Sequence, residues 1–169
     1  MKKQIKNIVI IGMPGCGKTT IGKMVSSKLN KKFVDLDDYI EHKENCTIPE
    51  IFQRGEEYFR SLESKAAEEV SLEENLVIST GGGVIKNKQN IINLKKNGVV
   101  IFVDRPLKNI IGDVDISTRP LLRNGTAEIE KLFQERYGLY NSYCDFSVYN
   151  ICDIEKTVDD IIEIYKNCV

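Results

Sequence analysis

Short apolar runs alternate along the chain with longer segments in which apolar residues recur every three or four positions. The short runs predict β-strands, and consecutive β-branched residues predict central strands buried on both faces. The longer segments have the period of amphipathic helices. The expected strands are residues 8–11, 33–37, 76–79, 99–104 and 146–149. The expected helices are residues 20–29, 38–44, 56–71, 87–96, 127–143 and a last helix capped by Thr157, with shorter ones after Thr47 and Pro106.

Strands and helices alternate in order, which predicts a parallel sheet covered by helices on both faces. We therefore expect one three-layer α/β domain over residues 1–169, with a five-stranded parallel sheet. Residues 36–62 insert short helices between the second and third strands, and we expect this insertion to hold a substrate. Residues 112–125 are mostly polar and flanked by glycines, which predicts a mobile lid.

The first strand runs directly into a glycine-rich loop, residues 12–20, with the spacing G-x-x-x-x-G-K-T of a phosphate-binding loop. Such a loop turns its backbone N–H groups inward around phosphates, and the following helix adds its positive N-terminal end. Lys18 supplies a cation for the outer phosphates, and the Thr19 hydroxyl is placed to bind Mg²⁺. The expected nucleotide-binding residues of the loop are Gly12, Gly15, Cys16, Gly17, Lys18, Thr19 and Thr20.

Two further groups of residues follow expected strands. Asp35 and Asp37 end the second strand, where alternation would point both carboxylates the same way, and Gly81–Gly83 follows the third strand. Ligands of parallel α/β sheets bind beyond the carboxyl ends of the strands, so we expect these residues beside the phosphate loop. The alternatives are structural. The glycines of the phosphate loop and of Gly81–Gly83 could form plain turns, and the acids could cap the next helix.

Composition and charge disfavour some classes of partner. A formal net charge of −1 with scattered basic residues argues against nucleic acid and against a charged membrane surface. No apolar segment is long enough to span a bilayer, and the N-terminal apolar run is too short for an export signal. The five cysteines have neither CxxC nor zinc spacing, so we expect reduced thiols in a cytoplasmic protein. We also expect a monomer.

Phosphate-binding loops serve ATPases, GTPases and small-molecule kinases. The sequence has neither the guanine motif N/TKxD nor the DxxG of a GTPase switch. A compact chain with an insertion, a lid and several arginines favours a kinase that closes over a small acceptor and excludes water. The alternative from another class is a nucleotide-dependent binding module without acceptor chemistry.

A set of motifs between residues 12 and 140 resembles the shikimate kinase family. Beyond the phosphate loop, the motifs are Asp35-Leu36-Asp37, Phe59-Arg60-Ser61-Leu62-Glu63, Ser79-Thr80-Gly81-Gly82-Gly83, Arg119-Pro120-Leu121-Leu122 and Arg136-x-x-x-Tyr140. The resemblance implies a P-loop kinase fold with strand order 2-3-1-4-5. It also implies transfer of the γ-phosphoryl group of ATP to the 3-hydroxyl of shikimate, giving shikimate 3-phosphate and ADP in aromatic amino-acid biosynthesis. Kinases of gluconate or of a nucleoside monophosphate are the enzyme alternatives.

The resemblance also implies roles for single residues. Arg60 and Arg136 correspond to arginines that bind the shikimate carboxylate, and Asp37 to the acid that holds ring hydroxyls and receives the proton of the attacking oxygen. Asp35 corresponds to the acid linked to Mg²⁺ through water, and Arg119 to a lid arginine that reaches the phosphates or the substrate. The implied catalytic residues are Lys18, Asp37 and Arg119. The implied substrate-binding residues are Asp37, Arg60, Gly81, Gly82, Gly83 and Arg136, and the metal-binding residues are Thr19 and Asp35.

The arginines have plainer alternatives. Arg60 could pair with Glu56 or Glu63 on its own helix, which would contribute only ~0.5 kcal/mol, although we expect Glu63 to orient it for a site. Arg136 could pair with Glu135 or face solvent. The lid arginine could be a solvated loop charge.

The chain departs from the family pattern in residues 141–145, after Tyr140, and at one position before the lid arginine. Seven residues before the lid Arg-Pro pair, the family usually has an arginine packed near the adenine, and this chain has Gly112. Arg105 or another cation could replace it. Residues 153–157 are expected to form the adenine loop.

Overall fold

A computed structural model describes residues 5–113 and 125–169 of the chain. The described residues form a five-stranded parallel sheet of order β2-β3-β1-β4-β5, which confirms the expected fold class and strand order. The strands are β1 (Asn7–Ile11), β2 (Lys32–Asp35), β3 (Leu76–Ser79), β4 (Gly98–Asp104) and β5 (Phe146–Tyr149). The helices are α1 (Lys18–Leu29), α2 (Leu36–Glu44), α3 (Ile48–Phe52), α4 (Glu56–Val70), α5 (Lys88–Leu94), α6 (Leu107–Asp113), α7 (Thr126–Tyr143) and α8 (Ile154–Cys168), with a 3₁₀ turn η1 (Val84–Lys86).

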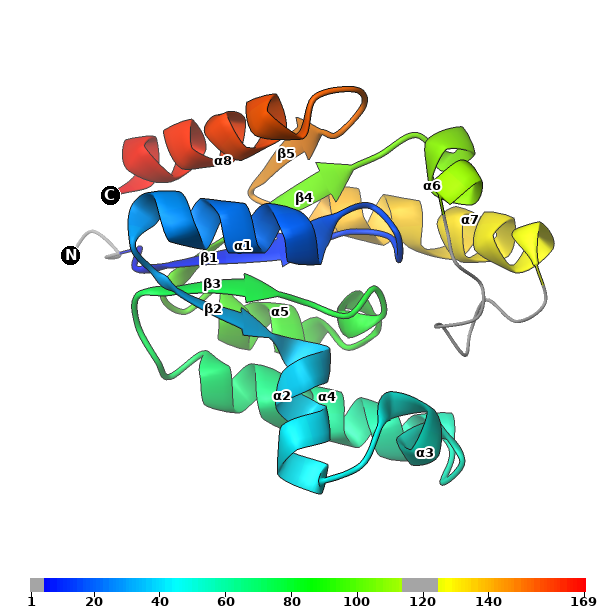
Figure 1. The fold of residues 1–169 in the computed structure, drawn as a ribbon. Helices are drawn as coiled ribbons and strands as arrows, with labels where there is room; N and C mark the ends of the chain where they lie inside the picture. The colour runs from blue at the N-terminus through cyan, green and yellow to red at the C-terminus, as the bar shows by residue number, and fades with distance from the viewer. Residues whose placement is uncertain (1–4, 114–124) are drawn as a thin grey trace.

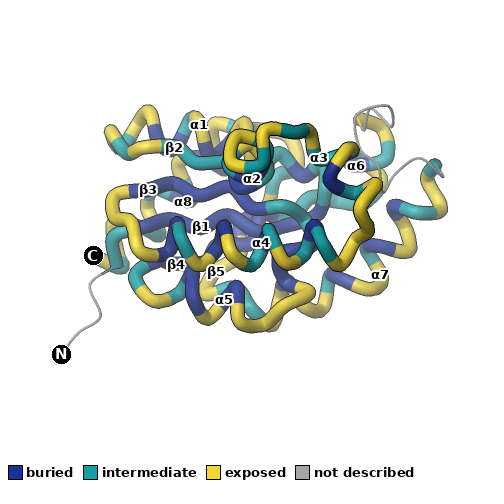
Figure 2. The backbone as a smooth tube through the Cα atoms, turned by 90° about the horizontal axis from the view of Figure 1, so that it is seen from below, coloured by how far each residue is buried: buried dark blue, intermediate teal, exposed yellow. Residues whose placement is uncertain are grey.

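The helices form a layer on each face of the sheet. Helices α1 and α8 cover one face, and α4, α5 and α7 cover the other (Figure 1). Strand β1 is central: it pairs with β3 and β4, and all of its residues are buried, as the dark strands at the middle of Figure 2 show. Because parallel strands end at one edge, the segments that follow β1, β2 and β3 meet there.

Strand β2 is shorter than its sequence pattern predicts. It ends at Asp35, and Asp37 lies in α2, so the expectation that strand alternation points both carboxylates the same way is wrong. The Asp35 side chain explains the early end, because Asp35 Oδ1 accepts hydrogen bonds from the backbone N–H groups of Asp37 (3.0 Å) and Asp38 (3.5 Å). With Asp35 as its N-cap, helix α2 begins at the next residue, Leu36, which confirms the capping alternative for Asp35.

The last helix also begins earlier than expected. Asp153 caps α8 by accepting from the backbone N–H groups of Glu155 and Lys156, so Thr157 is not the cap. Thr157 is buried inside the helix, and its hydroxyl donates to the carbonyl of Tyr149 (3.0 Å). Most of residues 153–157, expected as an adenine loop, is therefore the first turn of α8, and the β5–α8 connection is residues 150–153.

The insertion between β2 and β3 contains α2, α3 and the first half of α4. Figure 1 shows α2 and α3 beyond the β2 end of the sheet. The expected start of α3 is confirmed, because Thr47 and Glu50 form a capping box. Helix α6 continues through Gly112 and Asp113, two residues that the sequence pattern assigned to the lid. Residues 114–124, including Arg119, lie outside the described residues.

Among the helices of the described residues, none combines the length and apolar character needed to cross a bilayer.

Candidate active site

The phosphate loop between β1 and α1 depends on glycine geometry. Gly17 has φ 99°, in the left-handed region that side chains disfavour, and it precedes the first residue of α1. At Gly12 a Cβ atom would lie 2.7 Å from both the Val103 carbonyl oxygen and Cys16 Sγ. Cys16 is fully buried beneath the loop. Cys16 therefore fills space under the loop, and Gly12 is required by the close approach of its neighbours.

Lys18 lies inside the phosphate loop. Its side chain is buried, and Nζ donates to the carbonyls of Gly12 and Met13, at 2.9 Å each. The Lys18 Nζ atom is also 3.8 Å from Cys16 Sγ. These contacts hold an ammonium group within a ring of backbone groups, which is the position expected for a cation that neutralises phosphate oxygens.

Three oxygen-bearing side chains meet beside the first turn of α1. The Thr19 hydroxyl donates to Asp35 Oδ2 (2.8 Å), and Ser79 Oγ lies 3.5 Å from Thr19 Oγ1. Hydroxyl and carboxylate oxygens are hard ligands that suit Mg²⁺, which commonly takes one or two protein ligands and keeps waters and substrate phosphates. The donor set therefore fits Mg²⁺ at Thr19 and Asp35. Sequence analysis did not assign a role to Ser79, although it opens the motif that ends β3.

The half-buried Arg60 and the buried Glu63 form an ion pair at the far side of the site. Arg60 Nη1 donates to Glu63 Oε2 (2.8 Å), and its Nη2 donates to Glu56 Oε1 (3.1 Å). Burial lowers the pKa of Arg60, but the two carboxylates outweigh burial and raise it above its ordinary value. Burial raises the pKa of the Glu63 carboxyl, against the opposing charge of Arg60. Arg60 therefore both pairs with the carboxylates of its own helix and lines the pocket, so the two alternatives are compatible.

The glycines after β3 allow close approach to these charged groups. A Cβ atom on Gly81 would lie 2.9 Å from Glu63 Oε1 and 3.1 Å from Asp37 Oδ1. A Cβ atom on Gly83 would collide with the Arg60 guanidinium group. None of Gly81–Gly83 has a positive φ, so their importance is the missing side chain rather than backbone freedom.

The glycine segment is held from two directions. The Thr80 hydroxyl donates to the Ile10 carbonyl (2.9 Å), which fastens the segment to β1. The Tyr140 hydroxyl donates to the Gly82 carbonyl (2.5 Å) from α7. Tyr140 is fully buried, stacks on Phe102, and burial raises its pKa far above the ordinary value. Its hydroxyl therefore stays protonated as a donor.

Arg136 comes from α7, one turn before Tyr140, and only 4 % of its surface is exposed. The alternative of a solvent-facing arginine is therefore wrong. Arg136 lines the same pocket as Arg60, although the two arginines lie on different helices.

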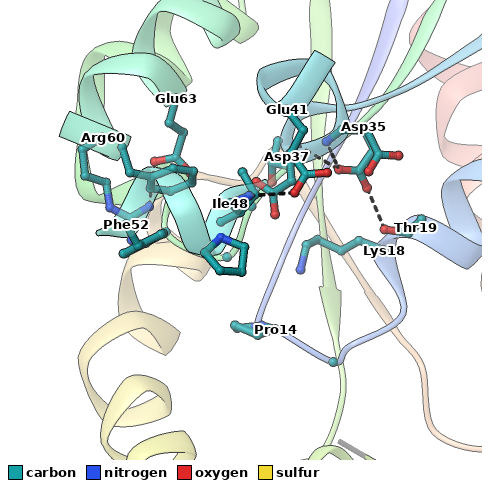
Figure 3. Close-up of a pocket in the computed structure, with 18 of the residues that line it drawn as sticks. Pro14, Lys18, Thr19, Asp35, Asp37, Glu41, Ile48, Phe52, Arg60 and Glu63 are labelled. Atoms are coloured by element: carbon teal, nitrogen blue, oxygen red, sulfur yellow. Dashed lines mark hydrogen bonds and ion pairs between the residues drawn. The ribbon is translucent and has the colours of Figure 1, made fainter. Parts of the chain in front are cut away.

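One pocket of about 510 Å³ joins these groups. In Figure 3, Asp37 lies between the Arg60–Glu63 pair and the Thr19–Asp35 pair, and Lys18 extends toward the space below it. The sequence-predicted residues that line this pocket are Gly15, Gly17, Lys18, Thr19, Thr20, Asp35, Asp37, Arg60, Gly81, Gly82, Gly83 and Arg136. Gly12 and Cys16 do not line it, since they support the loop from within.

The pocket has an apolar wall that sequence analysis did not assign. Ile48, Pro49 and Phe52 of α3 and Phe59 of α4 line it, and the Phe52 and Phe59 rings stack with centroids 4.6 Å apart. Glu41 of α2 shapes this wall, because its Oε1 accepts from the backbone N–H of Ile48 (2.7 Å). The signal for the wall was the apolar residues of the short helix α3 and the apolar face of α4.

A protein-family model described as shikimate kinase matches residues 14–166. The chain belongs to the shikimate kinase family. A shikimate kinase of Clostridium botulinum (strain Alaska E43 / Type E3) is 49% identical over 162 residues, which is 96% of each chain. A shikimate kinase of Clostridium beijerinckii is 50% identical over 157 residues, 93% of each chain. The solved structure of shikimate kinase from Acinetobacter baumannii in complex with shikimate has a TM-score of 0.91 and 29% identity, covering 98% of this chain and 95% of that one.

Shikimate kinases transfer a phosphoryl group from ATP to a hydroxyl of shikimate. Membership of the family confirms the expected activity, an ATP-dependent kinase with an alcohol acceptor, and its place in aromatic biosynthesis. Family membership does not favour the alternative kinases of gluconate or of a nucleoside monophosphate. It does not favour the nucleotide-dependent module without acceptor chemistry either. The roles of single residues stay predictions, and Arg119 cannot be placed because it lies outside the described residues.

Gly112 stands at the position that departs from the shikimate kinase pattern, and a Cβ atom on it would meet no atom of the described residues within 4 Å. Arg105, the proposed replacement cation, bonds to the Gly15 carbonyl of the phosphate loop (3.0 Å) and pairs with Asp113. Whether Arg105 contacts adenine stays a prediction.

Proposed function

We propose that the phosphate-loop side of this pocket binds ATP and the insertion side binds shikimate, with transfer of the γ-phosphoryl group to the 3-hydroxyl. The products are shikimate 3-phosphate and ADP. The observation that carries this proposal is the convergence of Lys18, Asp37, Arg60 and Arg136 on one pocket. Phosphates, alcohols and a carboxylate each have a matching partner there.

The acceptor side matches the chemistry of shikimate. A carboxylate is bound well by guanidinium groups, and Arg60 and Arg136 reach the pocket from α4 and α7. The Gly82 and Gly83 backbone supplies N–H groups without side chains that would block them. The apolar wall of α3 covers the carbon face of a small ring. Arg60 keeps its charge, because the carboxylates beside it raise its pKa.

Asp37 is the residue placed to act on the attacking oxygen. Its carboxylate lies close to Gly81 and faces the space between the two halves of the pocket (Figure 3). There it accepts hydrogen bonds from ring hydroxyls and receives the proton of the attacking hydroxyl as the oxygen–phosphorus bond forms. Most of the remaining rate enhancement comes from alignment and charge neutralisation, because phosphoryl transfer requires little covalent chemistry from the protein.

Lys18, Thr19, Asp35 and Arg119 act on the nucleotide side. Lys18 and Arg119 neutralise charge on the transferred group. Thr19 and Asp35 would hold Mg²⁺, and the ion would neutralise part of the negative charge of the ATP phosphates. The hydrogen bond between Thr19 and Asp35 supports this proposal, because it brings the two oxygens together beside the first turn of α1.

The test is a coupled assay that detects ADP release with shikimate, gluconate or AMP as the acceptor and with Mg²⁺ present. We expect turnover with shikimate alone, and mass spectrometry of the product should show one added phosphate. Turnover of gluconate or AMP without turnover of shikimate would overturn the assignment. ATP binding without any product would favour the nucleotide-binding module.

We also propose that the enzyme acts as a monomer in the cytoplasm. The pocket is built by one chain, which supports a monomer as the active unit. All five cysteines, each within the described residues, are free, as expected in a reducing compartment. Light scattering after size exclusion should give a mass near 19.2 kDa.

A further inference from the structure

Two side chains hold the phosphate loop from outside the pocket. Arg105, which follows β4, donates through Nη1 to the Gly15 carbonyl (3.0 Å). Asn150, which follows β5, donates through Nδ2 to the Cys16 carbonyl (2.9 Å). The two acceptors are consecutive carbonyls of the loop, but the two donors come from separate strand ends. Neither donor lines the pocket.

The direction of these bonds matters for the loop. Each peptide unit carries its N–H and C=O groups on opposite sides, so a carbonyl held outward keeps the N–H of the next residue turned inward. Fixing the Gly15 carbonyl therefore fixes the N–H of Cys16, which closes the turn of the loop by donating to the Met13 carbonyl (3.1 Å). Fixing the Cys16 carbonyl fixes the N–H of Gly17. A loop whose N–H groups are already oriented binds phosphate without first losing conformational freedom.

Both donors are themselves held in place. The Arg105 side chain is only 18% exposed and is also paired with Asp113 at the end of α6. The backbone N–H of Asn150 donates to the Asp104 carbonyl (2.8 Å), which ties the β5 end to β4. A Cβ atom on Gly17 would lie 3.0 Å from Asn150 Nδ2, so the amide packs directly on the loop.

We propose, on the basis of the proposed binding of ATP by this loop, that Arg105 and Asn150 are positioning residues for the nucleotide. They act through the Gly15 and Cys16 carbonyls and touch neither the acceptor nor the reacting atoms. Their loss should weaken nucleotide binding and leave the acceptor side intact. A residue that only stabilised the fold would lower the unfolding temperature without this selectivity.

The sharpest variant is Asn150→Asp, which keeps the size of the side chain and replaces the donor with a carboxylate oxygen that faces the Cys16 carbonyl. We expect KM for ATP and Kd for ADP, measured by calorimetry without acceptor, to rise roughly tenfold, as for loss of one buried hydrogen bond. KM for shikimate should change less than twofold. Asn150→Ala, which removes the donor without adding a charge, should shift both nucleotide constants in the same direction by less.

Asn109→Asp is the matched control. Asn109 on α6 donates to the carbonyl of Ile151 (3.4 Å), one residue beyond Asn150, and no hydrogen bond within the described residues joins its side chain to the phosphate loop. The same chemical change there should leave the nucleotide constants unchanged. Equal effects of Asn109→Asp and Asn150→Asp would overturn the proposal, because they would show a general effect on the β5–α8 connection.

Arg105 is tested by Arg105→Met and Arg105→Lys. The methionine variant should raise Kd for ADP about tenfold, and lysine, which keeps a donor, should restore part of the affinity. Asp113→Asn should have a smaller effect, because the Gly15 contact remains. Native Kd for ADP in both Asn150→Ala and Arg105→Met would overturn the proposal. A native enzyme that binds ADP but does not phosphorylate shikimate would instead overturn the proposed function and leave the positioning role standing.

Discussion

The two halves of the pocket are built in different ways. The core of the phosphate half is one continuous loop, whose backbone groups and one lysine are proposed to bind ATP, and its geometry depends on glycines such as Gly17. The acceptor half collects side chains from α2, α4 and α7 and from the segment after β3. Its order depends on buried charge pairs such as Arg60–Glu63. A local motif can specify the first half, whereas only the tertiary fold can specify the second.

The largest effect should come from the phosphate half. Lys18→Ala removes the buried cation and should lower kcat by about 10³-fold, because the charge on the transferred phosphoryl group is then not neutralised. Lys23→Ala, at an exposed position on the same helix, is the control and should retain native turnover. Steady-state assays with saturating shikimate measure both variants. Native turnover of Lys18→Ala would show that the site is misplaced.

Asp37→Asn tests the meeting point of the two halves. Asparagine keeps the shape and the hydrogen-bonding capacity but is a far weaker proton acceptor, so kcat should fall by roughly 10²- to 10⁴-fold. The thermal unfolding temperature should stay near the native value, which would separate a chemical role from a structural one. If turnover is unchanged, Asp37 is not the proton acceptor.

Gly83→Ala tests the acceptor half alone. The new methyl group would collide with the Arg60 guanidinium and displace it, so KM for shikimate should rise roughly ten- to a hundredfold, as for a lost charge-assisted hydrogen bond. KM for ATP should change little. Gly138→Ala on α7 is the matched control, because a Cβ atom there meets nothing within 4 Å and alanine is the better helix former. Equal rises in both KM values would contradict the division into halves.

The smallest effect should be a change in pH dependence. Burial raises the pKa of Glu63 above its ordinary value, so as the pH falls this carboxylate takes up a proton before an ordinary glutamate does. The ion pair with Arg60 is then lost, and KM for shikimate should rise at acid pH. In Glu63→Gln this acid rise should be absent, with KM already raised at neutral pH. Glu57→Gln, exposed on the same helix, should keep the native profile.

The same difference explains what the sequence could predict. Apolar runs and helical periods predicted the strand and helix order, and the place of the Lys18 loop between β1 and α1 was predicted because its motif is consecutive in the sequence. The roles of its residues stay predictions, and Gly12 and Cys16 do not line the pocket. The acceptor residues became a set only through resemblance to a family. The ends of β2 and α8 were misjudged because single carboxylates, Asp35 and Asp153, cap the following helices. The period of apolar residues does not indicate where a side chain accepts hydrogen bonds from the first backbone N–H groups of a helix.

The side-chain contacts that hold the phosphate loop from other strand ends were beyond sequence reasoning. Arg105 and Asn150 lie 90 and 134 positions from the carbonyls that they hold. Nothing in the residues around them indicates those partners. The burial of Arg136 is similar, since it follows from the packing of α7 on the sheet rather than from the polar residues beside it.

The two carboxylate oxygens of Asp35 accept hydrogen bonds from different elements. Oδ1 begins α2, and Oδ2 accepts from Thr19. A carboxylate is a rigid planar group. A movement of the Thr19 hydroxyl that rotates it would therefore also change its hydrogen bonds to the first turn of α2, which carries Asp37. If Thr19 and Asp35 bind Mg²⁺ as proposed, the arrival of the ion would therefore also act on the first turn of α2 and on Asp37, the proposed proton acceptor.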